Sequence, residues 1–133
     1  MKYLLDTNTC IRYINGRAPK LRLKLPTIPM VDVVVCDIVV AELFYGAAKS
    51  NTPRESLAKQ QAFLQPYVSL PFDGKAAMQY GLIRAQLEKQ GIPIGSLDML
   101  IAAIVLANDL ILITHNTDEF RRVNNLKIED WEG

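Results

Sequence analysis

Three acidic residues of this chain lie in apolar segments where an isolated charge is costly. Asp6 directly follows a short apolar run, Glu42 interrupts the apolar stretch 38–45, and Asp98 opens the apolar segment 99–106. Carboxylates in such surroundings are usually paired with a cation, cap a helix or bind a metal. Because the three are far apart in the sequence, they predict one acidic site assembled by the fold.

Each carboxylate also has a purely structural interpretation. Asp6 could cap the helix that follows it, and Asp98 could be favoured by the dipole at the start of its own helix. Neither argument applies to Glu42, which lies in the middle of a helical segment. Its best structural alternative is a salt bridge to a core-facing arginine such as Arg84.

A shared site would need a compensating charge. Two carboxylates about 4 Å apart repel each other by several kcal/mol even at an effective dielectric constant near 20. Crowding therefore raises their pKa values, and a divalent cation removes the repulsion. Oxygen ligands favour Mg²⁺ or Mn²⁺ over zinc, and such ions keep positions open for water and phosphate oxygens. This chemistry suits phosphodiester hydrolysis.

Short apolar runs alternate with helical segments along the whole chain. Strands are predicted at 3–5, 31–36, 67–70, 110–114 and 127–128, and helices at 8–14, 38–48, 53–64, 74–90 and 97–108, with a helical turn at 117–120. Asp73 and Ser96 are the expected caps of two of these helices. The role of Asp37 is open, and capping the helix at 38–48 is one interpretation of it. The segment 18–29 is either a short helix after Pro19 or an irregular connection. The alternation predicts an α/β fold with a short parallel sheet covered by helices on both faces.

The expected topology also predicts where the acidic residues meet. Ligands of open parallel sheets bind beyond the carboxyl ends of the strands. Asp6 follows the first strand, His115 and Asn116 follow the fourth, and Asp98 lies at a helix start that faces the same edge. His115 itself is expected only to end its strand.

Bulk properties restrict the function further. The 133 residues predict one domain, residues 1–133, and a net charge of +1 argues against a protein that holds nucleic acid by overall charge alone. Two cysteines without a C-x-x-C motif predict neither a disulfide framework nor a zinc site. No signal peptide or membrane span is expected, so the predicted location is the cytoplasm, without a membrane partner.

Four motifs together resemble those of the PIN-domain ribonucleases and, more narrowly, the VapC toxins of toxin–antitoxin pairs. They are Leu4-Leu5-Asp6-Thr7-Asn8, Ala41-Glu42-Leu43 with Gly46, Ile94-Gly95-x-x-Asp98-x-x-Ile101-Ala102-Ala103, and Thr114-x-Asn116-x-x-Glu119-Phe120. The resemblance implies a PIN fold and Mg²⁺-dependent endonucleolytic cleavage of RNA, with Mn²⁺ as a substitute ion. It also implies inhibition by a VapB-type antitoxin, and a homodimer. Within the family, the motifs are similar to those of the group that cuts initiator tRNA in its anticodon loop.

The resemblance assigns roles by position. Asp6, Glu42 and Asp98 match the acidic residues of the family site, both as metal ligands and as catalytic residues. Many relatives carry an aspartate where this chain has Asn116, so Glu119 becomes the expected fourth catalytic carboxylate. Asp118 beside it remains an alternative.

Supporting roles fall to three further residues. Thr7 and Asn8 match the motif at the strand end and would orient Asp6 or bound water. Arg84, on the long predicted helix, either pairs with a site carboxylate or lies at the surface.

Two rival functions follow from the same residues. A PIN-like module could bind RNA or a protein partner without cleaving, but three embedded carboxylates would then have no purpose. A metal-dependent phosphatase or nucleotide hydrolase would be expected to carry a nucleophilic Asp-x-Asp or a glycine-rich phosphate loop. Asp6-Thr7-Asn8 provides neither.

Overall fold

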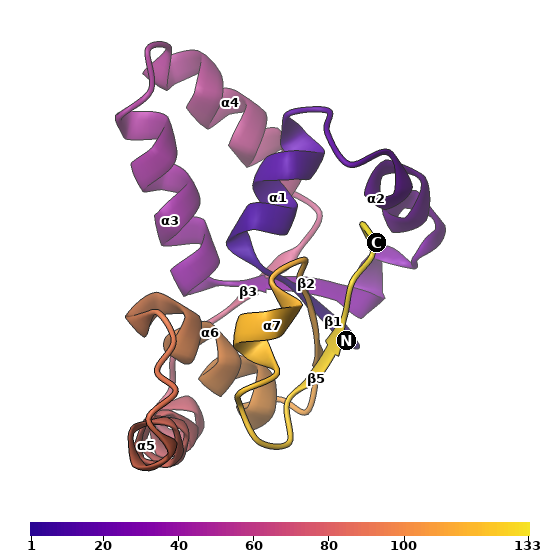
Figure 1. Cartoon of the computed structure of the whole chain (residues 1–133). Coiled ribbons are helices and arrows are strands. Elements are labelled where there is room, and N and C mark those ends of the chain that lie inside the picture. Colours follow the sequence, from indigo (N-terminus) through magenta and orange to yellow (C-terminus); the bar gives the residue numbers. More distant parts are fainter.

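Five parallel strands form one central sheet in the computed structural model, which describes all 133 residues. The strand order is β3-β2-β1-β4-β5 (Figure 1). The strands are β1 (Tyr3–Leu5), β2 (Val33–Cys36), β3 (Val68–Leu70), β4 (Ile111–Ile113) and β5 (Lys127–Glu129). The predicted parallel sheet is confirmed, with the last strand at its edge.

Burial explains why these short runs become strands. All four residues of β2 are buried, and Tyr3 of β1 pairs with Val33 of β2 on one side and Ile111 of β4 on the other. Strands covered on both faces need no polar alternation, which matches their continuous apolar sequences. The chain order reverses between β1 and β4, and this point of an open sheet is where ligands usually bind.

Seven helices cover the sheet. They are α1 (Thr7–Ile14), α2 (Pro19–Lys24), α3 (Asp37–Ala48), α4 (Pro53–Leu64), α5 (Gly74–Gln90), α6 (Ser96–Ala107) and α7 (Thr117–Phe120). Helices α1, α3 and α4 pack together on one side of the sheet, and α5 packs on α6 on the other (Figure 1). The predicted coverage of both faces is thus confirmed.

Three details differ from the sequence predictions. Residues 31 and 32 belong to the short 3₁₀ turn Met30–Asp32, so β2 begins only at Val33. Asp37 is the first residue of α3 and caps nothing: its Oδ1 accepts a hydrogen bond from the Ser69 hydroxyl at 2.6 Å. Ser96 likewise begins α6, while Gly95 holds the cap position without a side-chain bond.

Other local predictions are confirmed. Asp73 caps α5 by accepting a hydrogen bond from the Ala76 amide at 3.0 Å, and Gly91 ends that helix with a φ of 67°. The open segment 18–29 forms α2 followed by the 3₁₀ turn Leu25–Thr27. Both cysteines are buried and free.

The core is centred on α6, which is apolar along most of its length. Its residues 101–105 are all buried, at most 1% exposed. This burial fixes the direction of the helix, and with it the position of Asp98 in its first turn. None of the helices combines the length and apolar character that crossing a bilayer requires.

Candidate functional site

Asp6 lies at the carboxyl end of β1 and caps α1. Its Oδ1 accepts a hydrogen bond from the Thr9 amide at 2.8 Å, and the residue is only 5% exposed. Burial raises the pKa of this carboxyl, although hydrogen bonds with Thr114 and Thr9 and the charge of Arg12 act in the opposite direction. The capping interpretation is therefore correct, but a cap alone does not require so deep a position.

Glu42 lies half-buried on α3 beside the start of α1. The Thr7 hydroxyl donates a 2.6 Å hydrogen bond to Glu42 Oε1, which joins the two helices. No lysine or arginine lies within ion-pair distance of Glu42. The alternative of a salt bridge to Arg84 does not hold, because Arg84 lies exposed on α5 and pairs with Glu88 at 3.0 Å and with the Tyr80 hydroxyl at 3.1 Å. Glu42 is therefore an embedded carboxylate without a neutralising cation.

Asp98, in the first turn of α6, provides the clearest sign that the carboxylates converge. Its pKa is raised from 3.8 to about 6, first by burial and then by the negative charges of Glu119, Glu42 and Asp6. Four carboxylates from four segments of the chain thus act on one another electrostatically. The structure brings together all three residues of the predicted acidic trio and the predicted fourth.

Glu119, in α7, is held by two hydrogen bonds. Its Oε1 accepts the Gly95 amide at 3.0 Å, and its Oε2 accepts the side-chain amide of Asn116 at 2.5 Å. The Asn116 side chain is therefore a hydrogen-bond donor that holds the Glu119 carboxylate in place. Asp118, in contrast, is 95% exposed at its side chain and lies 3.8 Å from Arg121. The structure thus places Glu119, and not Asp118, with Asp6, Glu42 and Asp98. These four carboxylates form the acidic rim.

Two residues at the rim were missed by sequence reasoning. Thr114 is buried at the end of β4 and hydrogen-bonds Asp6, while the Gly95 backbone holds Glu119. A Cβ atom at Gly95 would stand 3.2 Å from Asp98 Oδ2, so glycine leaves room for that carboxylate. The only available signal was their position inside the motifs.

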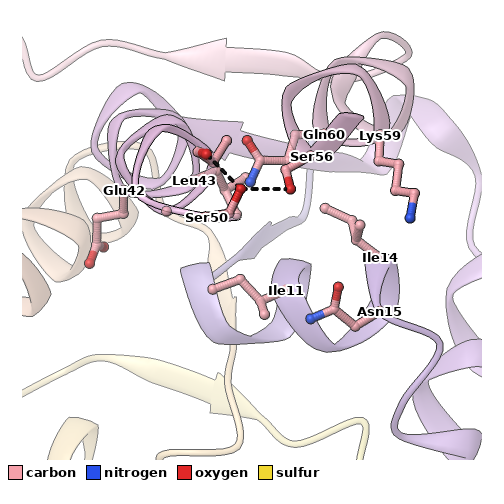
Figure 2. A pocket seen from close by; sticks show the side chains of 11 residues that line it. Ile11, Ile14, Asn15, Glu42, Leu43, Ser50, Ser56, Lys59 and Gln60 are labelled. Carbon is pink, nitrogen blue, oxygen red and sulfur yellow. Dashed lines mark hydrogen bonds between the residues drawn. The ribbon is translucent and has the colours of Figure 1, made fainter. Parts of the chain in front are cut away.

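Two hollows adjoin Glu42. One, of about 480 Å³, is lined among others by Thr7, Asn8, Glu42, Tyr45 and Lys49. Asn8 is exposed there and has no side-chain hydrogen bond. The other, of about 260 Å³, lies between α1, α3 and α4, with Glu42 at one end (Figure 2). Glu42 therefore lines two separate hollows and is reachable through both.

Comparisons with known proteins agree with this geometry. The family model described as PIN domain matches residues 3–126. A tRNA(fMet)-specific endonuclease VapC of Shigella flexneri is 37% identical over 98% of both chains, and a ribonuclease VapC2 of Haemophilus influenzae is 40% identical over 98% of both. The chain belongs to the VapC branch of the PIN-domain family.

Solved structures similar to this chain come from VapBC complexes. The VapC-like chain in DNA-bound VapBC from Salmonella typhimurium superposes with a TM-score of 0.93 and 36% identity, covering 98% of each chain. A chain of VapBC2 from Rickettsia felis, bound to a promoter DNA fragment, gives a TM-score of 0.90 at 34% identity, with 98% and 99% coverage. The predicted fold is confirmed.

The donor set of the PIN domain fits the divalent metal on which nucleases of this family generally depend. All four side chains offer carboxylate oxygens, the ligands that hard divalent cations prefer. Their mutual repulsion, seen in the raised pKa of Asp98, is what a cation would relieve. Without a metal, no three of these four carboxylates have oxygens all within 4.8 Å of one another, so they face each other across a wider space.

The charge of Asp98 has a measurable cost for the metal-free PIN domain. The pKa of Asp98 is about 6 in the folded chain, above the ordinary 3.8. The contribution of Asp98 to stability is therefore full below pH 3.8 and is lost as the pH rises through about 6. In EDTA at about pH 7.5, we expect Asp98→Asn to raise the free energy of unfolding by about 1 kcal/mol, a figure reduced for partial solvent screening.

Urea unfolding measures this effect. The gain should shrink as the pH falls from about 6 toward about 4, since the wild-type carboxyl is then neutral in the folded chain. Asp118→Asn, which changes an exposed carboxyl, should have no such effect. A lower stability of Asp98→Asn at pH 7.5 would contradict the crowding of the four carboxylates.

Proposed function

We propose that the chain is a Mg²⁺-dependent endoribonuclease, the toxin of a VapBC-type pair. The observation that carries the proposal is the meeting of Asp6, Glu42, Asp98 and Glu119 at one edge of the sheet, where their charges raise the pKa of Asp98 to about 6. The names of the similar curated proteins, which are ribonucleases and tRNA(fMet)-specific endonucleases, support the reaction class.

We infer that Asp6, Asp98 and Glu42 hold the metal. When bound, Mg²⁺ supplies charge stabilisation at the scissile phosphate and acidifies water at neutral pH. Mn²⁺ has the same preference for oxygen ligands and should substitute. The divalent requirement is general in the family, while the choice of Mg²⁺ rests on the oxygen-only donor set.

The side chains of the rim have separate tasks in this mechanism. Thr7 fixes Glu42 through the 2.6 Å hydrogen bond, and Asn116 with the Gly95 amide fixes Glu119. One of these two glutamates accepts the proton of the attacking water. The water oxygen bonds to phosphorus as the bond to the ribose 3′ oxygen breaks. The leaving 3′ oxygen takes a proton from solvent water, so the products are a 5′-phosphate and a 3′-hydroxyl.

The groove beside Glu42 gives the RNA a place to bind. It contains the Lys49 ammonium, which lies over the Tyr45 ring at 4.8 Å from its centroid, and that tyrosine is 67% exposed. Proteins bind single-stranded RNA through cations that contact its phosphates and aromatic rings that stack on its bases. We propose the anticodon loop of initiator tRNA as substrate, in line with the name of the Shigella flexneri relative. Binding should weaken as salt rises.

A VapB-type antitoxin is the proposed protein partner. The similar solved structures are of VapBC complexes, which supports this assignment. The pocket between α1, α3 and α4 leads to Glu42, so an inserted segment would reach the acidic rim (Figure 2). We also propose a homodimer, which light scattering of the purified protein would test.

The proposed activity is tested with end-labelled initiator tRNA. Discrete cuts with 5′-phosphate ends are expected in Mg²⁺ or Mn²⁺ and not in EDTA, and co-purified antitoxin should suppress them. Uncut RNA under all metal conditions would favour a non-cleaving module. Hydrolysis of mononucleotides without RNA cutting would favour the phosphatase alternative.

Loss of the Thr7 hydroxyl should slow cleavage without removing any carboxylate. Thr7→Val keeps the side-chain shape but frees Glu42 Oε1, so we expect kcat to fall about 10-fold, equivalent to about 1.4 kcal/mol. Single-turnover cleavage of labelled tRNA measures the rate. Thr27→Val is the matched control, because its hydroxyl only contacts the Lys24 carbonyl in an exposed turn. Equal rates for Thr7→Val and wild type would remove Thr7 from the mechanism.

A further inference from the structure

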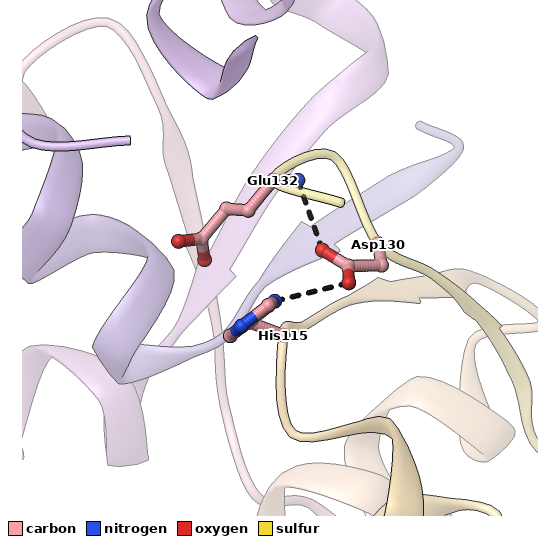
Figure 3. Close-up of side chains that lie close together, drawn as sticks. All are labelled: His115, Asp130 and Glu132. Carbon is pink, nitrogen blue, oxygen red and sulfur yellow. Dashed lines mark hydrogen bonds and ion pairs between the residues drawn. The ribbon is translucent and has the colours of Figure 1, made fainter. Parts of the chain in front are cut away.

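A second group of potential metal ligands lies apart from the four carboxylates. His115 follows β4, while Asp130 and Glu132 come from the segment after β5, and each offers a ligand atom within 4.8 Å of the others. Figure 3 shows the three side chains gathered from these two segments. It is the only set of three such side chains in the structure with this spacing.

Two members of the group are already fixed relative to each other. His115 Nδ1 lies 3.0 Å from Asp130 Oδ2, and the Glu132 amide donates to Asp130 Oδ1 at 2.9 Å (Figure 3). The pKa of Asp130 is lowered: burial raises it, but the hydrogen bonds from Glu132 and His115 together outweigh that effect. The group therefore holds an ionised carboxylate beside an imidazole.

Glu132 supplies a separate observation that points to a missing ligand. Its side chain is only 6% exposed, and its Oε2 is buried without any hydrogen-bond partner. Arg12 pairs with the other oxygen, Oε1, at 3.3 Å. Buried carboxylate oxygens are almost always satisfied, because an unpaired one loses its hydration without compensation. Glu132 therefore combines a buried, unpartnered oxygen with a ligand atom within 4.8 Å of an imidazole and a second carboxylate, as expected of a metal ligand.

We propose that His115, Asp130 and Glu132 form a second metal site that takes a first-row transition ion, with Zn²⁺ as the representative. Imidazole nitrogen with carboxylate oxygens suits zinc, whereas Mg²⁺ prefers oxygen alone. Arg12 neutralises one of the two carboxylates, so the carboxylates and Arg12 together present one net negative charge to a divalent ion. Three protein ligands leave a fourth tetrahedral position for water.

Occupation of this site would tie two parts of the chain together. The segment 130–132 would be joined to the connection between β4 and α7, which also carries Asn116. The ion would thereby stabilise the folded chain, and the free energy of unfolding would rise with the logarithm of the ion concentration above its dissociation constant. The inference does not depend on the proposed nuclease activity, because neither the ligands nor their geometry include the four carboxylates.

The single histidine of the chain makes the test direct. Imidazole resonances in an NMR spectrum can come only from His115, so they report on this site alone. With excess Mg²⁺ present to occupy oxygen-only sites, one equivalent of Zn²⁺ should shift both ring-proton signals, and Mg²⁺ alone should leave them in place. Unchanged signals at a few equivalents of Zn²⁺ would overturn the proposal.

Variants separate the proposed site from adventitious binding. Glu132→Gln and Asp130→Asn should each weaken Zn²⁺ binding, measured by competition with a chromophoric chelator, at least about 10-fold, or about 1.4 kcal/mol. Asp98→Asn should bind Zn²⁺ with wild-type affinity in Mg²⁺, which keeps this result separate from any failure of the nuclease proposal. Equal zinc affinity in wild type and both tail variants, each shown to be folded by circular dichroism, would overturn the site.

Discussion

Asp98→Asn protein is expected to cleave RNA at least about 1,000-fold more slowly than wild type, equivalent to about 4 kcal/mol of lost transition-state stabilisation. The substitution keeps the shape of the side chain but removes the charge that the three neighbouring carboxylates repel. It therefore removes a proposed metal ligand while relieving strain in the metal-free fold. Single-turnover rates with labelled tRNA, over a range of Mg²⁺ concentrations, measure the effect.

Asp118→Asn is the matched control for this substitution. Asp118 is an aspartate near the start of α7, one residue from Glu119, but its side chain is 95% exposed. It should cleave at the wild-type rate. Activity lost equally in both variants would indicate a general effect of charge on RNA binding, and full activity of Asp98→Asn would contradict the proposed site.

Asp6→Asn should slow cleavage about as much as Asp98→Asn does, without lowering the free energy of unfolding. Asparagine caps helices as well as aspartate does, so the bond from the Thr9 amide can persist. The substitution also removes a charge whose burial raises the pKa of Asp6. We therefore expect an unchanged or higher unfolding free energy in EDTA, together with a cleavage rate about 1,000-fold lower. Urea unfolding and single-turnover cleavage provide the two measurements.

Asp73→Asn tests whether capping alone accounts for the result. Asp73 caps α5 in the same way, through a 3.0 Å hydrogen bond from the Ala76 amide, but it is exposed and lies outside the acidic rim. Its variant should retain full activity. If Asp6→Asn were as active as Asp73→Asn, Asp6 would be only a helix cap.

Local sequence chemistry predicted most of the fold because each element carries its own signal. Apolar β-branched runs mark the strands, and Asp6, Asp73 and Gly91 mark helix ends through side-chain or backbone geometry that depends on near neighbours alone. A local preference decides less where a distant contact competes with it. Asp37 accepts a hydrogen bond from Ser69, 32 residues away, and does not cap its helix.

The site was predictable in its members but not in its contacts. Embedded carboxylates are visible as exceptions in an apolar sequence, so Asp6, Glu42 and Asp98 could be named in advance. Partners such as Thr7 for Glu42 depend on how α1 packs against α3, and the motif gave no sign of that contact. Arg84, considered as an alternative partner for Glu42 or as a surface residue, lies exposed on α5 and pairs with Glu88.

The contacts of His115 also could not be predicted from the sequence. Its nearest carboxylates in the sequence are Asp118 and Glu119, not Asp130 and Glu132, and it was expected only to end a strand. The parallel pairing of β4 with β5 brings the segment after each strand to the same edge. Asp130 and Glu132 thus reach His115 only in the folded chain.

Anomalous diffraction from crystals soaked in Mn²⁺ tests the central claim most directly, because it locates the ion without assuming any activity. We expect a peak at the rim within about 2–2.5 Å of carboxylate oxygens of Asp6 and Asp98, with Glu42 beside it, and no such peak in Asp98→Asn crystals. A well-ordered wild-type crystal without a peak at this rim, or with manganese bound only elsewhere, would contradict the account.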